Sequence, residues 1–291
     1  MQPSDFIHPE DAAALRQLES IPGFPALVKK VLALGLEQLQ YGINMATTIR
    51  LSSTQLPQLY RHLPPICERL GIAEPEFYLE MNPSPNACTF GDTKIYITIT
   101  SGLVELLDDE ELDAVIAHEC GHILCRHVLY NSVAQYLMIG ADALGILGSL
   151  TVPLQYAILY WKRKSELSCD RCAAVMTSPN TVAKTMARLA GGSKNITGNI
   201  NMEEWARQAD RYDRIYNDGL WNKALQISAI MKLDHPFCAV RVREILRWAA
   251  GSQYQSLKQR LQALPRGRQC PACGRTIEST WIYCKYCGTK L

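Results

Sequence analysis

The sequence predicts a mostly helical α+β protein, in which one large domain contains a small sheet and a short cysteine-rich module follows at the C-terminus. Three observations predict this fold class. Apolar residues recur at helical spacing along most of the chain, two short segments alternate as strands do, and two Cys-x-x-Cys pairs lie near the C-terminal end. The 291 residues, 47% hydrophobic and 20% charged, suffice for one sizeable core and an appendage.

The first part of the chain is predicted to be helical, with two strands after it. Residues 11–45 have a helical periodicity that breaks near Pro22 and Pro25, and residues 56–70 form a further helical stretch that Pro64-Pro65 disturb in its middle. The predicted strands are residues 77–81 and 94–100, of which the second alternates isoleucine with tyrosine or threonine. If this second strand lies at a sheet edge, an extended peptide can pair with its backbone.

The next predicted helix, residues 111–125, carries two histidines. Asp108 or Asp109 can cap its N-terminus, and acidic residues fill its first turn. His118 and His122 are four residues apart and project from the same helical face, so their imidazoles can bind one metal ion. Two histidines on a helix can also be ordinary buried or surface residues, so the flanking sequence has to decide.

The flanking residues favour the metal site. They complete the stretch His118-Glu119-Cys120-Gly121-His122, with apolar residues on both sides. Glu119 lies about 100° round the helix from His118, where it can take a proton from a water that the ion activates. Gly121 is small, as expected where another backbone comes close.

A site with two histidines needs a third protein ligand and leaves a fourth position open for water. Glu166 and Asp170 are four residues apart on a second predicted helix, residues 164–174. Glu166 is expected to bind the metal, while Asp170 accepts a hydrogen bond from the other ring nitrogen of one histidine and so fixes its tautomer. Taken alone, the two carboxylates can also be a solvated pair beside the basic residues 162–164.

The residues between these two helices are apolar enough to resemble a membrane span. Residues 132–161 contain Asp142 as their only charge, and three basic residues follow. A single crossing of a bilayer about 30 Å thick would separate His122 from Glu166. Two crossings need about 40 apolar residues, where 30 are available. We therefore expect a buried helical hairpin without a full span, and shallow membrane contact stays open.

Four cysteines near the C-terminus predict a second metal site. They form two Cys-x-x-Cys pairs, each followed by glycine, and are Cys270, Cys273, Cys284 and Cys287. This pattern is typical of a closed, tetrahedral structural zinc site, and so short a module depends on its metal for folding. The module resembles the small zinc ribbons found at protein termini. We expect it to contact protein or to be purely structural, and nucleic acid is the less favoured partner.

The order of the motifs resembles that of the HtpX-like zinc metalloendopeptidases, the family that also contains the CAAX prenyl protease of the integral-membrane type. The resemblance covers roughly Glu68 to Trp248. Its elements are Asn86 to Gly91, Ser101-Gly102-Leu103, the histidine pair, Ser165-Glu166 with Asp170, and His235-Pro236. It implies a zincin-type catalytic domain of the H-E-x-x-H gluzincin class, in which Glu166 is the third zinc ligand and Asp170 its supporting acid.

The resemblance also implies roles for residues outside the two helices. His235 would lie near the metal, where it stabilises the oxyanion or occupies the open coordination position in a resting state. Arg241 follows on the next helix. Equally, His235 can be a turn residue that caps this helix. The segment that begins with Asn86, Ala87 and Cys88 is expected to bind substrate and to form one wall of the cleft.

Charge and cysteine content restrict the class of protein. The net charge of +2 is too close to zero to indicate nucleic-acid binding. The N-terminus has no recognisable secretory signal, so we expect a cytoplasmic protein, peripheral to the membrane if the apolar hairpin touches it. Seven of the eleven cysteines lie outside the ribbon, and we expect them to be reduced small hydrophobes. The pair Cys169 and Cys172 is interpreted as packing, with a redox role as the less favoured alternative.

The predicted function is that of a zinc-dependent endopeptidase with one catalytic and one structural zinc ion. Glu119 acts as the general base and passes the proton to the leaving nitrogen. The substrate is a polypeptide, including unfolded or membrane-associated protein. The alternative is a self-inhibited or inactive, metal-stabilised binding protein that acts through its zinc ribbon.

The predicted domain organisation has three parts. Residues 1–252 form the zinc metallopeptidase domain, with its core at about 68–248. Residues 253–268 form a helix and a basic linker, and residues 269–291 form the zinc ribbon. Residues 202–231 are predicted to be helical, without assignable chemistry.

Overall fold

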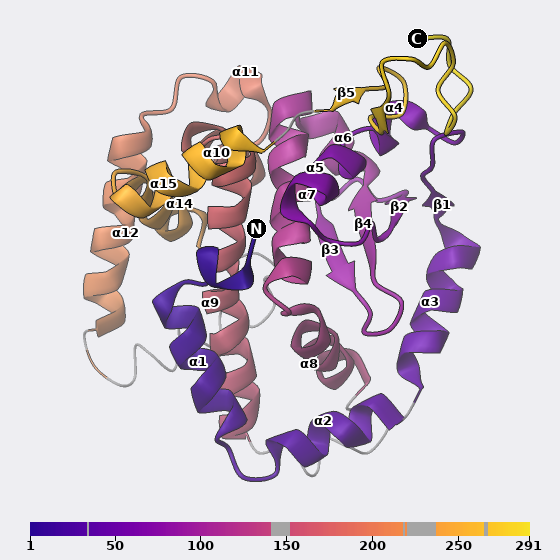
Figure 1. Ribbon diagram of the computed structural model, residues 1–291. Helices are drawn as coiled ribbons and strands as arrows, with labels where there is room; N and C mark the ends of the chain where they lie inside the picture. The colour runs from indigo at the N-terminus through magenta and orange to yellow at the C-terminus, as the bar shows by residue number, and fades with distance from the viewer. Residues whose placement is uncertain (34, 141–151, 218, 220–236, 265–266) are drawn as a thin grey trace.

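The computed structural model describes residues 1–33, 35–140, 152–217, 219, 237–264 and 267–291. Two long helices, α7 (Asp109–Leu124) and α9 (Val152–Met176), lie side by side at its centre, and a small sheet flanks α7 (Figure 1). The mostly helical architecture with a small sheet agrees with the prediction.

Helix α7 begins where the sequence predicted and runs close to α9. Asp108 caps its N-terminus by accepting a hydrogen bond from the backbone N–H of Glu111, whose own side chain returns to the backbone of Asp108. A methyl group added to Gly121 would lie 3.1 Å from Cys169 Cα and 3.1 Å from Cys172 Cβ. The two helices therefore touch at Gly121, because larger side chains would separate them.

The four-stranded sheet has the order β1-β2-β4-β3. Its strands are β1 (Ile49–Arg50), β2 (Glu76–Glu80), β3 (Ala87–Phe90) and β4 (Tyr96–Thr100). Strand β4 pairs in parallel with β2 and antiparallel with β3. Because β4 is internal, the strand that precedes the metal helix offers no free edge. Among the described residues the last strand in this order is β3, which the sequence had predicted only as a wall segment.

Two N-terminal helices pack against the described parts of the apolar segment that resembled a membrane span. Helices α1 (Pro9–Glu19) and α2 (Phe24–Ala33) are separated near Pro22 and Pro25, as predicted, and α3 (Leu36–Thr47) begins after Gly35. Helices α1 and α2 pack on α8 (Val128–Gly140) and on the first part of α9. The residues of this second core include Ala14, Leu18, Phe24, Val133, Ile158 and Trp161.

Part of the predicted hairpin, residues 141–151, lies outside the described residues. Within the described part of the chain, none of the helices combines the length and apolar character that crossing a bilayer requires. Among the side chains that are described, Val133 of α8 and Ile158 and Trp161 of α9 are buried against residues of α1 and α2.

The predicted helix over residues 56–70 is two helices, α4 (Pro57–Tyr60) and α5 (Leu63–Leu70). Pro64 and Pro65 lie in the first turn of α5 and do not interrupt a longer helix. Proline is tolerated in a first turn because the N–H that it lacks would have no partner within the helix.

The remaining helices cover the other side of α9 (Figure 1). They are α10 (Pro179–Gly191), α11 (Lys194–Thr197), α12 (Met202–Asn217), α14 (Cys238–Ala249) and α15 (Ser252–Ala263). A 3-10 helix (Pro3–Asp5) precedes α1, and α6 (Ser101–Leu106) follows β4. Helix α12 covers the first half of the helix predicted over residues 202–231, and residues 218 and 220–231 lie outside the described residues.

The C-terminal module is packed on the main body, beside α4 (Figure 1). It contains the short strands β5 (Arg268–Gln269) and β6 (Thr276–Ile277), which pair with each other. Three of its cysteines and Ile277 belong to the main hydrophobic core. The Arg275 guanidinium donates hydrogen bonds to the Tyr60 hydroxyl (2.7 Å) and to Glu74 (3.1 Å). The module therefore belongs to the same packed body as the large domain.

Candidate active site

The three predicted metal ligands meet between α7 and α9. Glu166 Oε2 lies 3.3 Å from His118 Nε2, and Glu166 Oε1 lies 3.4 Å from His122 Nε2. His118, His122 and Glu166 are 6%, 3% and 2% exposed. Side chains from two separate stretches of sequence thus converge in a buried place.

The spacing of these atoms fits a small divalent ion. Ligand atoms at about 2.0–2.1 Å from a tetrahedral zinc ion lie about 3.3–3.4 Å from one another. The two nitrogen–oxygen distances, 3.3 and 3.4 Å, have this length. Two imidazoles and one carboxylate are also the donor set that hydrolytic zinc sites use.

Asp170 lies behind His118, on the side away from Glu166. Its Oδ1 accepts a hydrogen bond from His118 Nδ1 at 3.0 Å, which puts the lone pair of the ring on Nε2. Arg241, on α14, donates to both Asp170 oxygens at 2.6 and 2.8 Å and lies 3.1 Å from Glu166 Oε2. Arg241, which the sequence placed only on the helix after His235, therefore links the two carboxylates.

The charges around the site set the proton affinities of its groups. Burial raises the pKa of Asp170, but Arg241 and His118 outweigh this effect and hold it below its usual value. Burial lowers the pKa of His118, but Glu166 and Asp170 raise it to about 9. Burial also lowers the pKa of His122, and here the lowering prevails. A metal ion has to displace any proton on Nε2 before it binds.

Glu119 projects beside the ligands, and Thr89 holds it. The carboxylate is 2% exposed, and Thr89 on β3 donates its hydroxyl proton to Glu119 Oε2 at 2.6 Å. The same hydroxyl lies 3.2 Å from the Glu119 backbone carbonyl. Thr89 belongs to the Asn86 to Gly91 motif, but no role could be assigned to it from the sequence. The sequence held no signal for this role, because the strand that carries Thr89 is only four residues long.

A cavity of about 220 Å³ opens beside His118 and Glu119. Apolar side chains from α6, α7 and α10 form much of its wall, including Leu103, Val115, Val182, Met186 and Leu189. Asn86 and Ala87 also line it, as expected for a cleft wall, whereas Cys88 is exposed on β3 and is not among its lining residues. His235 lies outside the described residues.

Cys169 also lies close to the histidines. Its sulfur is within 4.8 Å of a nitrogen of both His118 and His122. It lies 3.6 Å from His127 Nδ1, which in turn faces His122 Nδ1. Cys169 is thus on the Nδ1 side of His122, whereas Glu166 is on the Nε2 side. Burial raises the pKa of its thiol well above the usual value, which disfavours the thiolate that metals bind.

No disulfide joins any of the eleven cysteines, all of which lie in the described residues. Cys169 and Cys172 are fully buried at the α7–α9 contact, and burial raises the pKa of both thiols. This agrees with their interpretation as packing residues. Cys88 differs from the expected buried cysteines because it is exposed.

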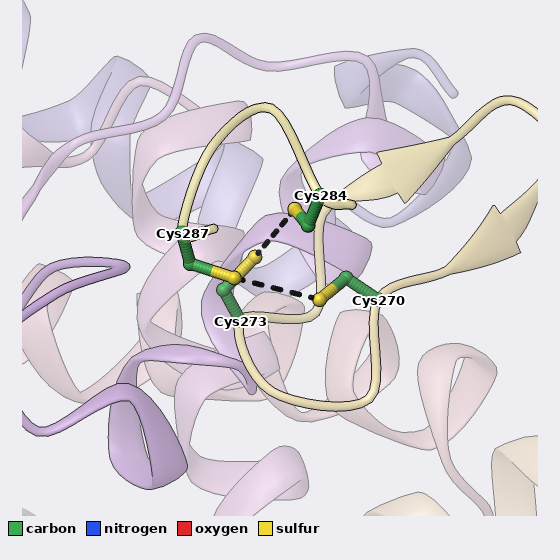
Figure 2. A group of neighbouring side chains, drawn as sticks. All are labelled: Cys270, Cys273, Cys284 and Cys287. Atoms are coloured by element: carbon green, nitrogen blue, oxygen red, sulfur yellow. Dashed lines mark hydrogen bonds between the residues drawn. The ribbon is translucent and has the colours of Figure 1, made fainter. Parts of the chain in front are cut away.

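The four C-terminal cysteines form the second cluster, and their sulfurs point toward one another (Figure 2). The Cys270 and Cys287 sulfurs are 3.6 Å apart, and the Cys273 and Cys284 sulfurs are 3.7 Å apart. Sulfurs at about 2.3 Å from a tetrahedral zinc ion lie about 3.8 Å apart. The donor set and spacing therefore fit a closed four-sulfur site.

Comparison with known proteins gives one family and several relatives. The family model described as peptidase family M48 matches residues 53–249. Plastoglobule-localized metallopeptidase 48, chloroplastic, of Arabidopsis thaliana is 34% identical over 261 residues, which cover 88% of this chain and 75% of that protein.

Two protease HtpX homologs match shorter segments. That of Pelotomaculum thermopropionicum is 32% identical over 117 residues, 38% of this chain and 42% of that protein. That of Trichormus variabilis is 28% identical over 181 residues, 52% of this chain and 63% of that protein. The chain thus spans less than two thirds of both HtpX homologs.

Proposed function

The chain belongs to peptidase family M48, and on that premise we propose that it is a zinc-dependent endopeptidase. The observation that carries the proposal is the convergence of Glu166 on the Nε2 atoms of His118 and His122 at 3.3 and 3.4 Å. These three side chains would hold the catalytic ion. The four cysteines of the C-terminal module would hold a structural one.

The chemistry follows from the groups around this site. A zinc ion held there by His118, His122 and Glu166 would polarise the scissile carbonyl and lower the pKa of water. Glu119 takes the proton of the attacking water and delivers it to the leaving nitrogen, and Thr89 keeps the carboxylate in place for both transfers. Asp170 holds His118 in the tautomer that presents Nε2 to the ion, and Arg241 keeps Asp170 ionised. By family resemblance His235 assists with the oxyanion.

The proposed substrate is a polypeptide in extended form. Strand β3 pairs with β4 and carries Ala87, which lines the cavity beside Glu119. The apolar walls of the cavity suit an apolar side chain next to the scissile bond. Unfolded or membrane-associated proteins expose such segments.

Two substitutions test the roles of the carboxylates. Glu119→Gln should keep both zinc ions and lose at least about 100-fold in casein hydrolysis, because the general base is gone. Glu166→Ala should lose one zinc ion per chain as well as activity. Glu105→Gln, at an exposed position on α6, serves as the control and should resemble the unaltered protein. Unchanged hydrolysis by Glu119→Gln would contradict the proposed role of Glu119.

We further propose a cytoplasmic protein that touches membranes at most peripherally. The proposed domains are residues 1–252, 253–268 and 269–291, with the zinc ribbon as a docked unit. Contact with another protein is its proposed role beyond structure. A pure binding function is not favoured, because the relatives are named as a metallopeptidase and as proteases.

A further inference from the structure

A tight turn at the end of α7 places His127 next to His122. Arg126 adopts a left-handed conformation (φ 62°), the His127 N–H donates to the His122 carbonyl (2.9 Å), and the Arg126 N–H donates to the Ile123 carbonyl (3.1 Å). This hydrogen-bond pair defines a Schellman turn, which reverses the chain directly after the helix. The ring of His127 therefore lies next to the ring of His122, with centroids 5.5 Å apart.

His127 lies between His122 and a carboxylate from the N-terminal helix. Its Nδ1 is 3.3 Å from His122 Nδ1, and its Nε2 is 3.0 Å from Asp11 Oδ2 on α1. Asp11 also accepts hydrogen bonds from the Trp161 indole (3.1 Å) and from the Ser168 hydroxyl (2.5 Å). Asp11 and His127 are each 1% exposed. A buried polar group without a hydrogen-bond partner destabilises the folded protein, and here Asp11 and His127 have such partners.

The charge state of Asp11 fixes one end of this chain of hydrogen bonds. Burial raises the pKa of Asp11, but the hydrogen bonds from His127, Ser168 and Trp161 lower it below its usual value. The ionised carboxylate accepts hydrogen bonds and donates none, so His127 Nε2 carries the proton of that contact.

A metal ion on His122 Nε2 would fix the other end. If His122 binds an ion through Nε2, its proton must be on Nδ1. The atom that faces this N–H is His127 Nδ1 at 3.3 Å, which accepts when the His127 proton is on Nε2. The opposite tautomer of His127 would set two N–H groups against each other. The donors therefore all point one way, from His122 through His127 to Asp11.

We propose that Asp11 and His127 form a hydrogen-bond relay that fixes the tautomer and orientation of His122, so that helix α1 positions the metal site. Asp11 would act on His122 as Asp170 acts on His118, except that the ring of His127 lies between Asp11 and His122. The inference rests on the proposed function in one respect, that His122 Nε2 binds the metal. Asp11 and His127 touch neither metal nor substrate and are positioning residues.

One neighbour competes with His127 for the same proton. Asn131 Nδ2 lies 3.3 Å from His122 Nδ1, and among the described residues its buried Oδ1 has no hydrogen-bond partner. An amide rotated by half a turn would present this oxygen to His122 instead. The experiment must therefore separate Asn131 from His127.

The test measures metal affinity without any substrate. Co²⁺ is titrated into the full chain after zinc has been restored to the four-sulfur site, and the visible bands of cobalt at the nitrogen–oxygen site report its occupancy. His127→Gln keeps a donor toward Asp11 but has no acceptor at the position of Nδ1. In Asp11→Asn the new amide N–H would face another N–H donor in either orientation of the amide, because His127 and Trp161 both donate to this side chain. Both variants should bind Co²⁺ about 10- to 100-fold more weakly.

Three further variants make the result specific. His127→Asn keeps an acceptor near the position of Nδ1 and should recover part of the affinity. Trp161→Phe removes a hydrogen bond to Asp11 but keeps the aromatic ring, and Asn131→Ala leaves the relay intact, so both should bind Co²⁺ within a few-fold of the unaltered chain. Unchanged affinity in His127→Gln or Asp11→Asn would overturn the proposal, as would a loss in Asn131→Ala as large as that in His127→Gln.

Failure of the relay and failure of the proposed function remain distinguishable. If the unaltered chain binds no Co²⁺ through its histidines, the peptidase proposal fails. If it binds the ion tightly and the His127 and Asp11 variants bind it equally well, the relay alone fails.

Discussion

Replacement of Thr89 by valine tests how far catalysis depends on the position of Glu119. Valine has the shape of threonine without the hydroxyl, so the buried site keeps its packing. The substitution removes the 2.6 Å hydrogen bond to Glu119 Oε2 and the weaker 3.2 Å contact to the Glu119 carbonyl. The carboxylate would then lose its hydroxyl donor on the sheet while it must still accept and deliver a proton.

The size of the effect follows from the kind of bond. A hydrogen bond to a charged group contributes about 1.5–3 kcal/mol. With about 1.4 kcal/mol for each factor of ten in rate, kcat should fall about 10- to 150-fold. KM should change little, because Thr89 contacts the base and not the substrate cavity.

Steady-state cleavage of a fluorogenic peptide measures both constants, and metal analysis is run on the same samples. Thr89→Ser is the matched control, since it keeps the hydroxyl and should retain most of kcat. A Thr89→Val protein with full zinc content and a kcat within about twofold of the unaltered enzyme would refute the reasoning.

Three further predictions concern stability. Gly121→Ala should lower it by about 1–3 kcal/mol in thermal unfolding, because the new methyl group would meet the Cys169 backbone at 3.1 Å; an unchanged midpoint would contradict the close contact. Burial raises the pKa of Glu37, but backbone N–H donors, including that of Asp92 at 2.7 Å, lower it below 4.5. The stabilisation that ionised Glu37 provides is therefore present above pH 4.5 and is lost as the pH falls through the lower pKa of the folded protein. In urea unfolding, Glu37→Gln should lower the free energy of unfolding by about 0.5–1 kcal/mol at neutral pH and by little in acid. Cys284→Ser should weaken metal binding at the proposed four-sulfur site and lower a single calorimetric transition by about 2–4 °C per kcal/mol lost. A separate ribbon transition would contradict the shared core.

The helices that carry the chemistry were predictable because their signals are local. Asp108 and Glu111 mark the start of α7, and the four-residue spacings of His118 with His122 and of Glu166 with Asp170 define two faces that can meet. Spacing predicted these two faces, and the resemblance to the HtpX-like family assigned Glu166 as the third ligand.

The partners behind the ligands were not predictable in the same way. Asp11 meets His127, and Thr89 meets Glu119, only through packing between elements distant in sequence. Periodicity says which face of an element is buried, but it does not say against which other element. Strand β3 was missed for a different reason: its four residues are too few to show a clear alternation.

The packing of α1 and α2 has a practical meaning for anyone who trims this protein. The matched segment, residues 53–249, leaves out both helices and the C-terminal module. An excised fragment of that length would uncover apolar side chains such as Ile158 and Trp161, which α1 and α2 now shield. It should therefore aggregate on expression, and its flanks have to be kept for a usable recombinant sample.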